Sequence, residues 1–217
     1  RGRRGRPPLG TSDARAVYFR DTSSTEKLVG NLVVVATRSR RETDFPLDAA
    51  SVTVVTGLAI VSIVFGNIAA LGQNRFKRLL AYSSVAHAGY MIFALTDTTG
   101  SRASDLLWYT AFYGLATVLA CASFAALSPD DDDLRVLEGK FATQPVASIL
   151  LAVAVLSLAG LPPLPGFFAK LFVFKSVIAS GHLVPAVIAF VGSFLGLAYY
   201  VGIVLRLFRR VPLAAAA

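Results

Sequence analysis

Long stretches of the sequence contain no charged residue, and these stretches constrain the fold more than any other feature. Apolar runs of about 18 or more residues are long enough to cross a bilayer core of roughly 30 Å as helices. Charged residues make up only 16% of the chain, against roughly a quarter in an average soluble domain, and 55% of its residues are hydrophobic. The sequence therefore predicts a polytopic membrane protein of the all-α class.

Five spanning segments are expected after the first 48 residues, and one of them is broken. The predicted spans cover residues 49–71, 79–95, 106–127, 145–178 and 183–207, and the fourth is interrupted at 160–166. Together they form a membrane domain of residues 49–210, followed by a C-terminal tail of residues 211–217. None of these predicted spans contains an aspartate or a glutamate.

Residues 1–48 differ in composition from the rest of the chain. The segment opens with Arg1, Arg3, Arg4 and Arg6 among glycines and prolines, and its first acidic residue is Asp13. Such a segment cannot bury a core, so we expect a largely irregular N-terminal extension. An Arg-rich, acid-poor segment is also typical of organelle-targeting peptides. This favours the mitochondrial inner membrane, with a bacterial plasma membrane as the alternative.

The chain carries a formal net charge of +8, which in a soluble protein would suggest a nucleic-acid partner. Here the basic residues lie in the N-terminal extension and at the ends of predicted spans. Lys and Arg at those positions orient membrane segments and contact anionic lipids. We therefore expect membrane lipids and no nucleic acid as partners. Lys and Arg are most frequent on the face that holds the loop at residues 72–78, the loop at 128–144 and the C-terminus, so this face is predicted to be cytoplasmic or matrix-facing.

The break in the fourth span arises from prolines and glycines that cannot continue a helix. These residues are Gly160, Pro162, Pro163, Pro165 and Gly166. Broken backbone at membrane depth is tolerated only where it is buried in protein or lines a hydrated cavity. Broken helices of this kind recur at the working sites of transporters. The break therefore predicts the position of a functional site.

Lys170 follows this break directly. An ammonium at membrane depth costs about 2.5–3.5 kcal/mol, and burial disfavours the charged form of the side chain. We therefore interpret Lys170 as a proton carrier that gains and loses a proton near neutral pH. The alternative is that its stem extends to the membrane surface, roughly 12 Å away along the helix. For Lys175, which lies nearer the helix end, that alternative is the favoured one.

A second polar cluster lies in the second predicted span. Tyr82, Ser83, Ser84 and His87 occupy about three turns of one helix that begins at a basic loop. These groups either conduct protons or form hydrogen bonds between helices. His87 has no second ligand at metal spacing, and Cys121 is the only cysteine, so no metal site is predicted.

Both clusters resemble motifs of a known family. Residues 74–90, NRFKRLLAYSSVAHAGY, resemble the tenth-helix motif of the antiporter-like subunits of complex I, the proton-pumping NADH:quinone oxidoreductase. Residues 156–170, LSLAGLPPLPGFFAK, resemble the broken twelfth helix of the same subunits. The sequences at 86–90 and 166–170 favour subunit 2, called subunit N in bacteria. The resemblance extends over about residues 51–208.

The resemblance implies a fold and a set of site residues. The five spans resemble the second of two inverted five-helix repeats. Lys170 then corresponds to the channel lysine of the twelfth helix, Lys77 to the lysine at the start of the tenth, and His87 to the histidine beside the central polar axis. Tyr82, Ser83 and Ser84 would belong to the same proton channel. The membrane glutamate and two lysines of the first repeat have no counterpart here, so the chain is either a fragment or one half of a divided subunit.

The resemblance also implies a function and its partners. The chain would be a non-redox subunit of NADH:ubiquinone oxidoreductase that binds no cofactor, with flavin and iron–sulfur clusters on other subunits. Its partners would be other membrane-arm subunits, including a separate chain that supplies the N-terminal half of subunit 2. The alternatives are a subunit of a multi-subunit cation/proton antiporter, a photosynthetic complex of the same type, and a purely structural half.

Overall fold

The computed structural model describes residues 48–98 and 100–209. The chain divides into two units, Arg1–Thr43 and Asp44–Ala217, and all described residues belong to the second. The predicted N-terminal extension, apart from Asp48, and the predicted C-terminal tail lie outside the described residues.

The described residues are helical, and apart from one isolated bridge between Arg75 and Asp133 they contain no β structure. The helices are α2 (Ala49–Leu71), α3 (Phe76–Ala94), α4 (Arg102–Leu127), the 3₁₀ helix η1 (Leu134–Leu137), α5 (Lys140–Thr143), α6 (Pro145–Ala159), α7 (Pro165–Ala179) and α8 (Leu183–Leu207). By length and composition, α2, α4 and α8 can each cross a membrane. The all-α class is confirmed.

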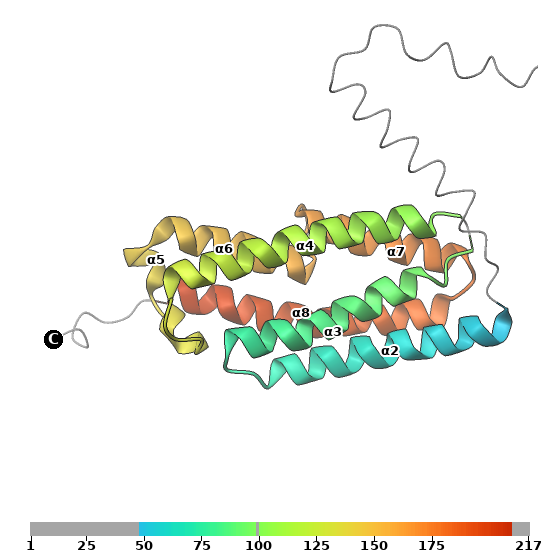
Figure 1. Cartoon of the computed structure of the whole chain (residues 1–217), viewed down its shortest axis with the longest axis horizontal. Coiled ribbons are helices and arrows are strands. Elements are labelled where there is room, and N and C mark those ends of the chain that lie inside the picture. Colours follow the sequence, from blue (N-terminus) through green and yellow to red (C-terminus); the bar gives the residue numbers. More distant parts are fainter. Residues whose placement is uncertain (1–47, 99, 210–217) are drawn as a thin grey trace, which may run out of the picture. The chain divides into compact units, whose positions relative to one another are not determined.

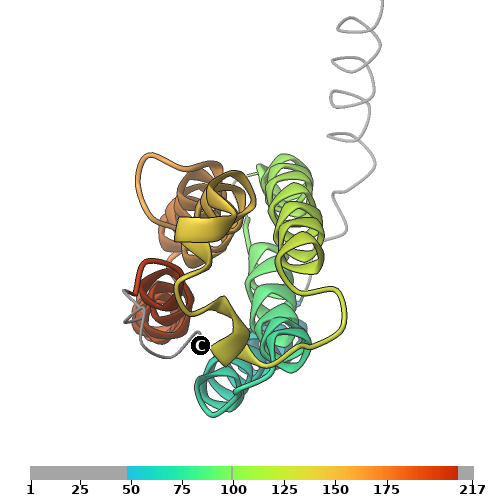
Figure 2. The ribbon, with the colours of Figure 1, turned by 90° about the vertical axis from the view of Figure 1, so that its left-hand side faces the viewer.

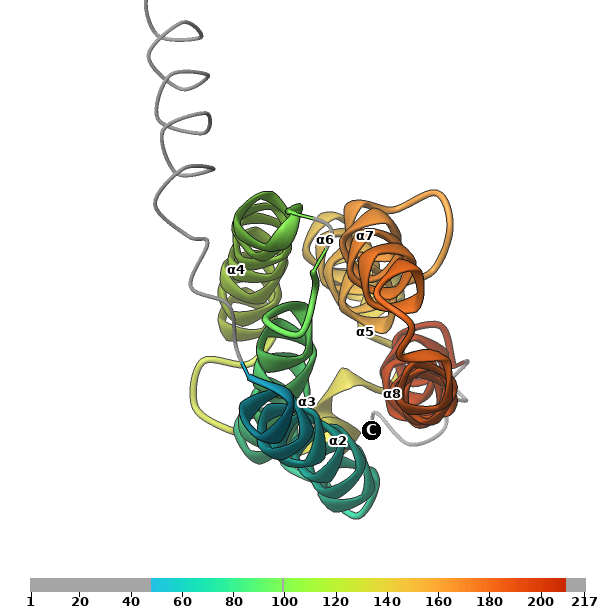
Figure 3. The same cartoon turned by 90° about the vertical axis from the view of Figure 1, so that its right-hand side faces the viewer.

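The long helices lie lengthwise beside one another (Figure 1). Viewed from the end, α4, α3 and α2 lie along one side of the bundle and α6, α7 and α8 lie along the other (Figure 3). The packing pairs are α2 with α3 and α8, α4 with α6 and α7, and α6 with α8. Many large apolar side chains on α2, α4 and α8 remain exposed on the outside, among them Val54, Leu115 and Phe194. Such a surface suits contact with lipid or with further membrane helices.

Small residues bring α2 and α3 into backbone contact. A Cβ atom on Gly66 would lie 2.5 Å from the backbone nitrogen of Ala86, and one on Gly89 would lie 2.8 Å from the carbonyl oxygen of Ala59. Close approach through small residues is common between membrane helices, where van der Waals packing drives association. This contact fixes the rotation of α3, and therefore the directions in which its polar residues point.

Three loop segments meet at one end of the bundle, seen face-on in Figure 2. The backbone nitrogen of Phe76 donates to the carbonyl oxygen of Asp132 at 2.7 Å, and Arg75 forms an ion pair of 3.3 Å with the Asp132 carboxylate. Arg209, beyond α8, forms an ion pair of 3.2 Å with Glu138. The basic loop, the acidic loop and the end of α8 therefore lie together, as the sequence predicted.

Candidate functional site

The fourth predicted span is broken between α6 and α7. Gly160 ends α6 with φ +83, a left-handed conformation that glycine adopts without steric cost. The Pro162–Pro163 peptide bond is cis. Pro165 occupies the start of α7, where a missing backbone N–H costs nothing. Residues 160–164 therefore form the break, and the predicted range of 160–166 was too long because Pro165 and Gly166 are helical.

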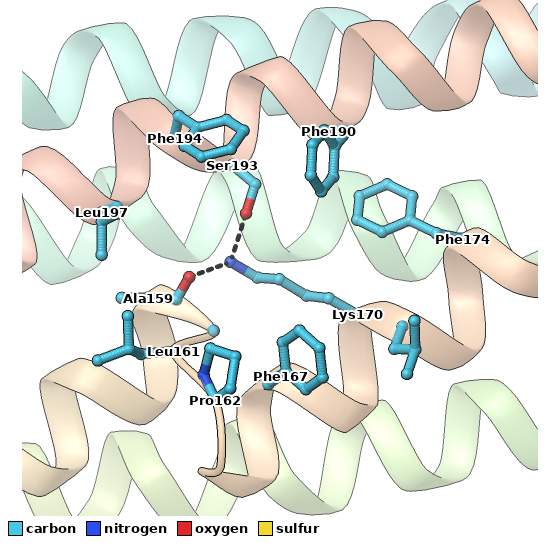
Figure 4. A pocket seen from close by; sticks show the side chains of 12 residues that line it. Ala159, Leu161, Pro162, Phe167, Lys170, Phe174, Phe190, Ser193, Phe194 and Leu197 are labelled. Carbon is cyan, nitrogen blue, oxygen red and sulfur yellow. Dashed lines mark hydrogen bonds between the residues drawn. The ribbon is translucent and has the colours of Figure 1, made fainter.

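Lys170 points from α7 towards the break and towards α8 (Figure 4). Its Nζ donates to the carbonyl oxygen of Ala159 at 2.9 Å and to Oγ of Ser193 at 3.0 Å. The same Nζ lies 5.3 Å from the centroid of the Tyr90 ring. The side chain is only 7% exposed, so it is held inside the bundle and does not extend to the helix end.

The broken backbone shapes the environment of this lysine. A helix leaves its last carbonyl groups without internal partners, and the Ala159 carbonyl at the end of α6 is one that Lys170 takes up. A Cβ atom on Gly160 would lie 2.9 Å from Cδ of Lys170 and 3.3 Å from its Nζ. Glycine at the break thus leaves the space through which the lysine side chain passes.

A cavity of about 270 Å³ lies between the break, α7 and α8, and Lys170 is among the residues that line it. Its walls are mostly apolar, with Phe167, Phe174, Phe190 and Phe194 among them (Figure 4). None of its lining residues is acidic. Within the described part of the chain, the lysine therefore meets hydroxyl, carbonyl and aromatic groups in this cavity, without a carboxylate.

His87 is buried on the side of α3 that faces α4. Its Nδ1 lies 2.9 Å from the hydroxyl oxygen of Tyr109, and its ring stacks on Tyr113 at a centroid distance of 4.6 Å. A small cavity of about 10 Å³ is lined by His87 together with Ser157 of α6 and Gly166 of α7, which flank the break. That volume is about the least that holds one water molecule. His87 of α3 therefore faces the end of α6 and the start of α7, next to the break, across this small cavity.

The predicted cluster on α3 does not point in one direction. Ser83 forms a hydrogen bond of 2.5 Å with the Tyr200 hydroxyl on α8. Ser84 donates to the Leu80 carbonyl at 2.8 Å and accepts from the Tyr113 hydroxyl on α4 at 2.7 Å. Neighbouring residues on a helix point about 100° apart, so the two serines serve different interfaces.

Two of the predicted site residues lie away from these contacts. Tyr82 is half-buried, and its ring packs edge-on against Phe65 of α2 at a centroid distance of 6.4 Å. Lys77 is exposed at the start of α3, beside the basic loop. The structure therefore brings Lys170, His87, Ser83 and Ser84 into the bundle interior, whereas Lys77 stays at its surface.

Further polar side chains that the sequence motifs did not indicate are buried, and Asn67 and Asp105 are two of them. Asn67 on α2 donates from Nδ2 to the Ile63 carbonyl at 2.8 Å and accepts from the Tyr199 hydroxyl at 3.1 Å. Asp105 is 7% exposed and accepts a hydrogen bond of 2.5 Å from Ser176. The prediction that no span contains an acid is wrong, because α4 begins at Arg102 and includes Asp105. Asn67, as the only amide in an otherwise apolar run, was a usable signal.

Replacement of Asn67 by leucine is expected to destabilise the bundle. The change keeps the side-chain size but removes the hydrogen bond that the buried Tyr199 hydroxyl donates to Asn67, and a hydrogen bond of this kind contributes about 0.5–1.5 kcal/mol. Thr56→Val is the matched control, because the Thr56 hydroxyl has no hydrogen-bond partner among the described residues. Thermal unfolding in detergent measures both variants. Equal melting temperatures for Asn67→Leu and Thr56→Val would contradict the structural role of Asn67.

The chain belongs to the family of membrane subunits shared by NADH:quinone oxidoreductases and Mrp antiporters. Residues 32–196 match the family model described as NADH:quinone oxidoreductase/Mrp antiporter, transmembrane. The chain is 57% identical over 163 residues to NADH-quinone oxidoreductase subunit N of Pelobacter propionicus, covering 75% of this chain and 35% of that protein. It is 45% identical over 153 residues to subunit 14 of the Thermus thermophilus enzyme, covering 70% and 35%. The resemblance drawn from the sequence motifs is confirmed.

Solved structures share the same fold. Respiratory complex I from Thermus thermophilus contains a chain that matches with a TM-score of 0.67 and 44% identity, over 73% of this chain and 36% of that chain. The Mrp complex from Dietzia sp. matches with a TM-score of 0.67 and 24% identity, over 74% and 30%, which shows the fold alone. The chain therefore spans about a third of the length of the relatives that it matches.

Proposed function

We propose that the chain is a non-redox part of the membrane arm of a proton-pumping NADH:quinone oxidoreductase and carries part of its proton path. The observation that carries the proposal is Lys170, a buried cation hydrogen-bonded to the Ala159 carbonyl of a broken helix and to Ser193. An ionisable group at such a position is expensive and marks a proton or ion path in membrane proteins. Similarity to subunit N supports the assignment to this enzyme.

The chemistry proposed for Lys170 is the gain and loss of a proton, without a covalent step. As an ammonium, it donates to the Ala159 carbonyl and the Ser193 hydroxyl; as a neutral amine, it still donates to both and gains one lone pair to accept a proton. A change of charge or hydration nearby shifts the balance between these forms, and such coupling acts in both directions. Electron transfer belongs to flavin and iron–sulfur groups on other subunits.

We assign the rest of the proton path to the part of the relatives' length that this chain does not match. The cavity at Lys170 has no acidic lining residue, so a carboxylate and further cations of the path are assigned to the N-terminal half, in a separate chain or in the same longer one. Other membrane-arm subunits complete the assembly.

The curated relatives are bacterial, which favours the plasma membrane over the mitochondrial inner membrane expected from the N-terminal composition. We propose ubiquinone as the quinone that this oxidoreductase reduces.

A second candidate function is a subunit of a multi-subunit cation/proton antiporter. The matching family model covers both groups of proteins, and the Mrp complex of Dietzia sp. has the same fold. Its identity of 24% is lower than the 44% shared with the chain from the Thermus thermophilus complex. A third reading, in which the chain only supports neighbouring helices, gives no role to the interior position of Lys170.

The first experiment identifies the assembly that contains this chain. Native membranes are extracted with mild detergent, separated on a native gel, stained for NADH oxidation and analysed by mass spectrometry. We expect the chain in a band that oxidises NADH and contains flavin and iron–sulfur subunits. A band that holds the chain with other antiporter-like proteins, without those redox subunits, would replace the oxidoreductase with the antiporter.

A further inference from the structure

We infer that Asp105 on α4 is a proton-relay group at the end of the bundle opposite the basic loop, an inference that rests on the proposed function. Asp105 is a buried carboxylate within a helix long and apolar enough to cross a membrane. Its Oδ2 accepts a hydrogen bond of 2.5 Å from Oγ of Ser176 on α7. An acid at such a position is costly and needs either a partner or a function.

The charged groups around Asp105 do not neutralise it. Lys175 on α7 is exposed and acts on Asp105 only through space, because no Lys or Arg forms an ion pair with Asp105 among the described residues. Arg102, one turn earlier on α4, donates instead to the backbone carbonyl of Asp97 at 2.8 Å. The Asp97 carboxylate accepts from Ser180 at 3.1 Å. The direct side-chain partner of Asp105 is thus a neutral hydroxyl, so the carboxylate can take up a proton without breaking an ion pair.

Asp105 lies on the same face of α4 as Tyr109, which contacts His87. Residues four apart on a helix share a face with Cβ atoms about 5–6 Å apart, so Asp105 and Tyr109 project from the same side of α4. Tyr109 is only 1% exposed, and its hydroxyl lies 2.9 Å from Nδ1 of His87. Carboxylate, phenol and imidazole therefore follow one another from the end of α4 towards the middle of the bundle. Each of these groups can accept one proton and release another.

Asp105 lies in the first turn of α4, at the end of the bundle opposite the basic loop (Figure 1). The first turn of α4 and the last turn of α7 lie at the end of the bundle opposite η1 and α5 (Figure 1). Lys170 and the break occupy the region between the two ends. A proton held near His87 and the break would therefore reach the opposite surface through Tyr109 and Asp105.

A purely structural role for Asp105 makes a different prediction. An acid in the first turn of a helix interacts favourably with the helix dipole, and its hydrogen bond ties α4 to Ser176 of α7. Asparagine has almost the same shape and its amide oxygen still accepts from Ser176, but it cannot carry a proton. The substitution Asp105→Asn therefore separates the two roles.

The test uses the intact membrane complex in liposomes and compares proton translocation with NADH oxidation measured in the presence of an uncoupler. We expect Asp105→Asn to assemble and oxidise NADH normally but to translocate protons through this chain at least about tenfold more slowly, because positioned proton-transfer groups contribute roughly 10²–10⁴-fold. Asp105→Glu should restore much of the translocation. Asp48→Asn, an exposed acid before α2 at the same end, is the matched control and should translocate normally.

Two further variants keep the test decisive if Asp105→Asn fails to assemble. Tyr109→Phe removes the hydroxyl that contacts His87 and is expected to slow translocation, whereas Ser176→Ala removes only the tie to α7 and should translocate nearly normally. Normal translocation by Asp105→Asn or Tyr109→Phe would overturn the relay. If Lys170→Met is impaired in that case, the proposed function still holds; normal translocation by Lys170→Met as well would overturn both.

Discussion

Replacement of Lys170 by methionine is expected to abolish proton translocation through this chain while leaving the chain in its complex. Methionine has a similar length and flexibility but carries no ionisable group. The Ala159 carbonyl and the Ser193 hydroxyl lose a donor, which costs about 1–3 kcal/mol for each buried group left unpaired. Removal of a buried ammonium, itself unfavourable by about 2.5–3.5 kcal/mol at membrane depth, offsets much of that loss. Folding should therefore survive, and proton transfer should not.

The matched control for this variant is Lys175→Met. Lys175 lies on the same helix but is exposed and does not line the cavity at Lys170, so the same change removes a charge without altering that cavity. Acidification of liposomes that contain the complex, measured per NADH oxidised, compares the two variants. We expect a loss for Lys170→Met and normal translocation for Lys175→Met. Equal translocation by the two variants would remove Lys170 from the proton path.

The broken helix and the place of Lys170 were predictable from the sequence because they follow from local chemistry. Pro162 and Pro163 cannot continue a helix, and Lys170 follows the break along the chain. The partners of Lys170 were not predictable in the same way. Ser193 and Tyr90 lie on helices far apart in the sequence, and their approach depends on how α3, α7 and α8 pack.

The polar cluster on α3 shows where the sequence interpretation was incomplete. Ser83 and Ser84 are adjacent in the sequence, but a helix directs adjacent residues to different faces. Because α2, α4 and α7 all pack against α3 and Tyr200 of α8 reaches it, Ser83 contacts Tyr200 whereas Ser84 contacts Tyr113 of α4. Helical periodicity predicts that the two serines diverge; only the packing shows which neighbour each one contacts.

The start of α4 was placed too late for a related reason. The apolar run begins at Leu106, and the predicted span began there, but the helix starts at Arg102. Helical hydrogen bonding does not require apolar side chains, so the first turn of a membrane helix can be polar. Asp105 falls in that first turn, where Ser176 on a distant helix satisfies its carboxylate. A span drawn from hydropathy alone therefore omits Asp105, which is buried in the fold.

Replacement of Gly166 by alanine is expected to prevent correct packing of the broken helix. A Cβ atom at this position would lie 1.8 Å from the carbonyl oxygen of Ser157, and the Gly166 backbone nitrogen donates to Oγ of the same serine at 3.1 Å. Since the obstacle is backbone, α6 and α7 would have to separate, and overpacking of this kind typically costs about 1–3 kcal/mol or more. Separation would also move the Ala159 carbonyl away from Lys170.

Gly202→Ala is the matched control for this change, because a Cβ atom on Gly202 of α8 would meet no atom within 4 Å. We expect Gly166→Ala to lower both the melting temperature and the amount of chain recovered in the complex, and Gly202→Ala to change neither by much. Any complex that still assembles with Gly166→Ala should translocate protons poorly, because Lys170 is held by the carbonyl that the change displaces. Normal assembly and translocation by Gly166→Ala would mean that the close contact between α6 and α7 does not hold the lysine in place.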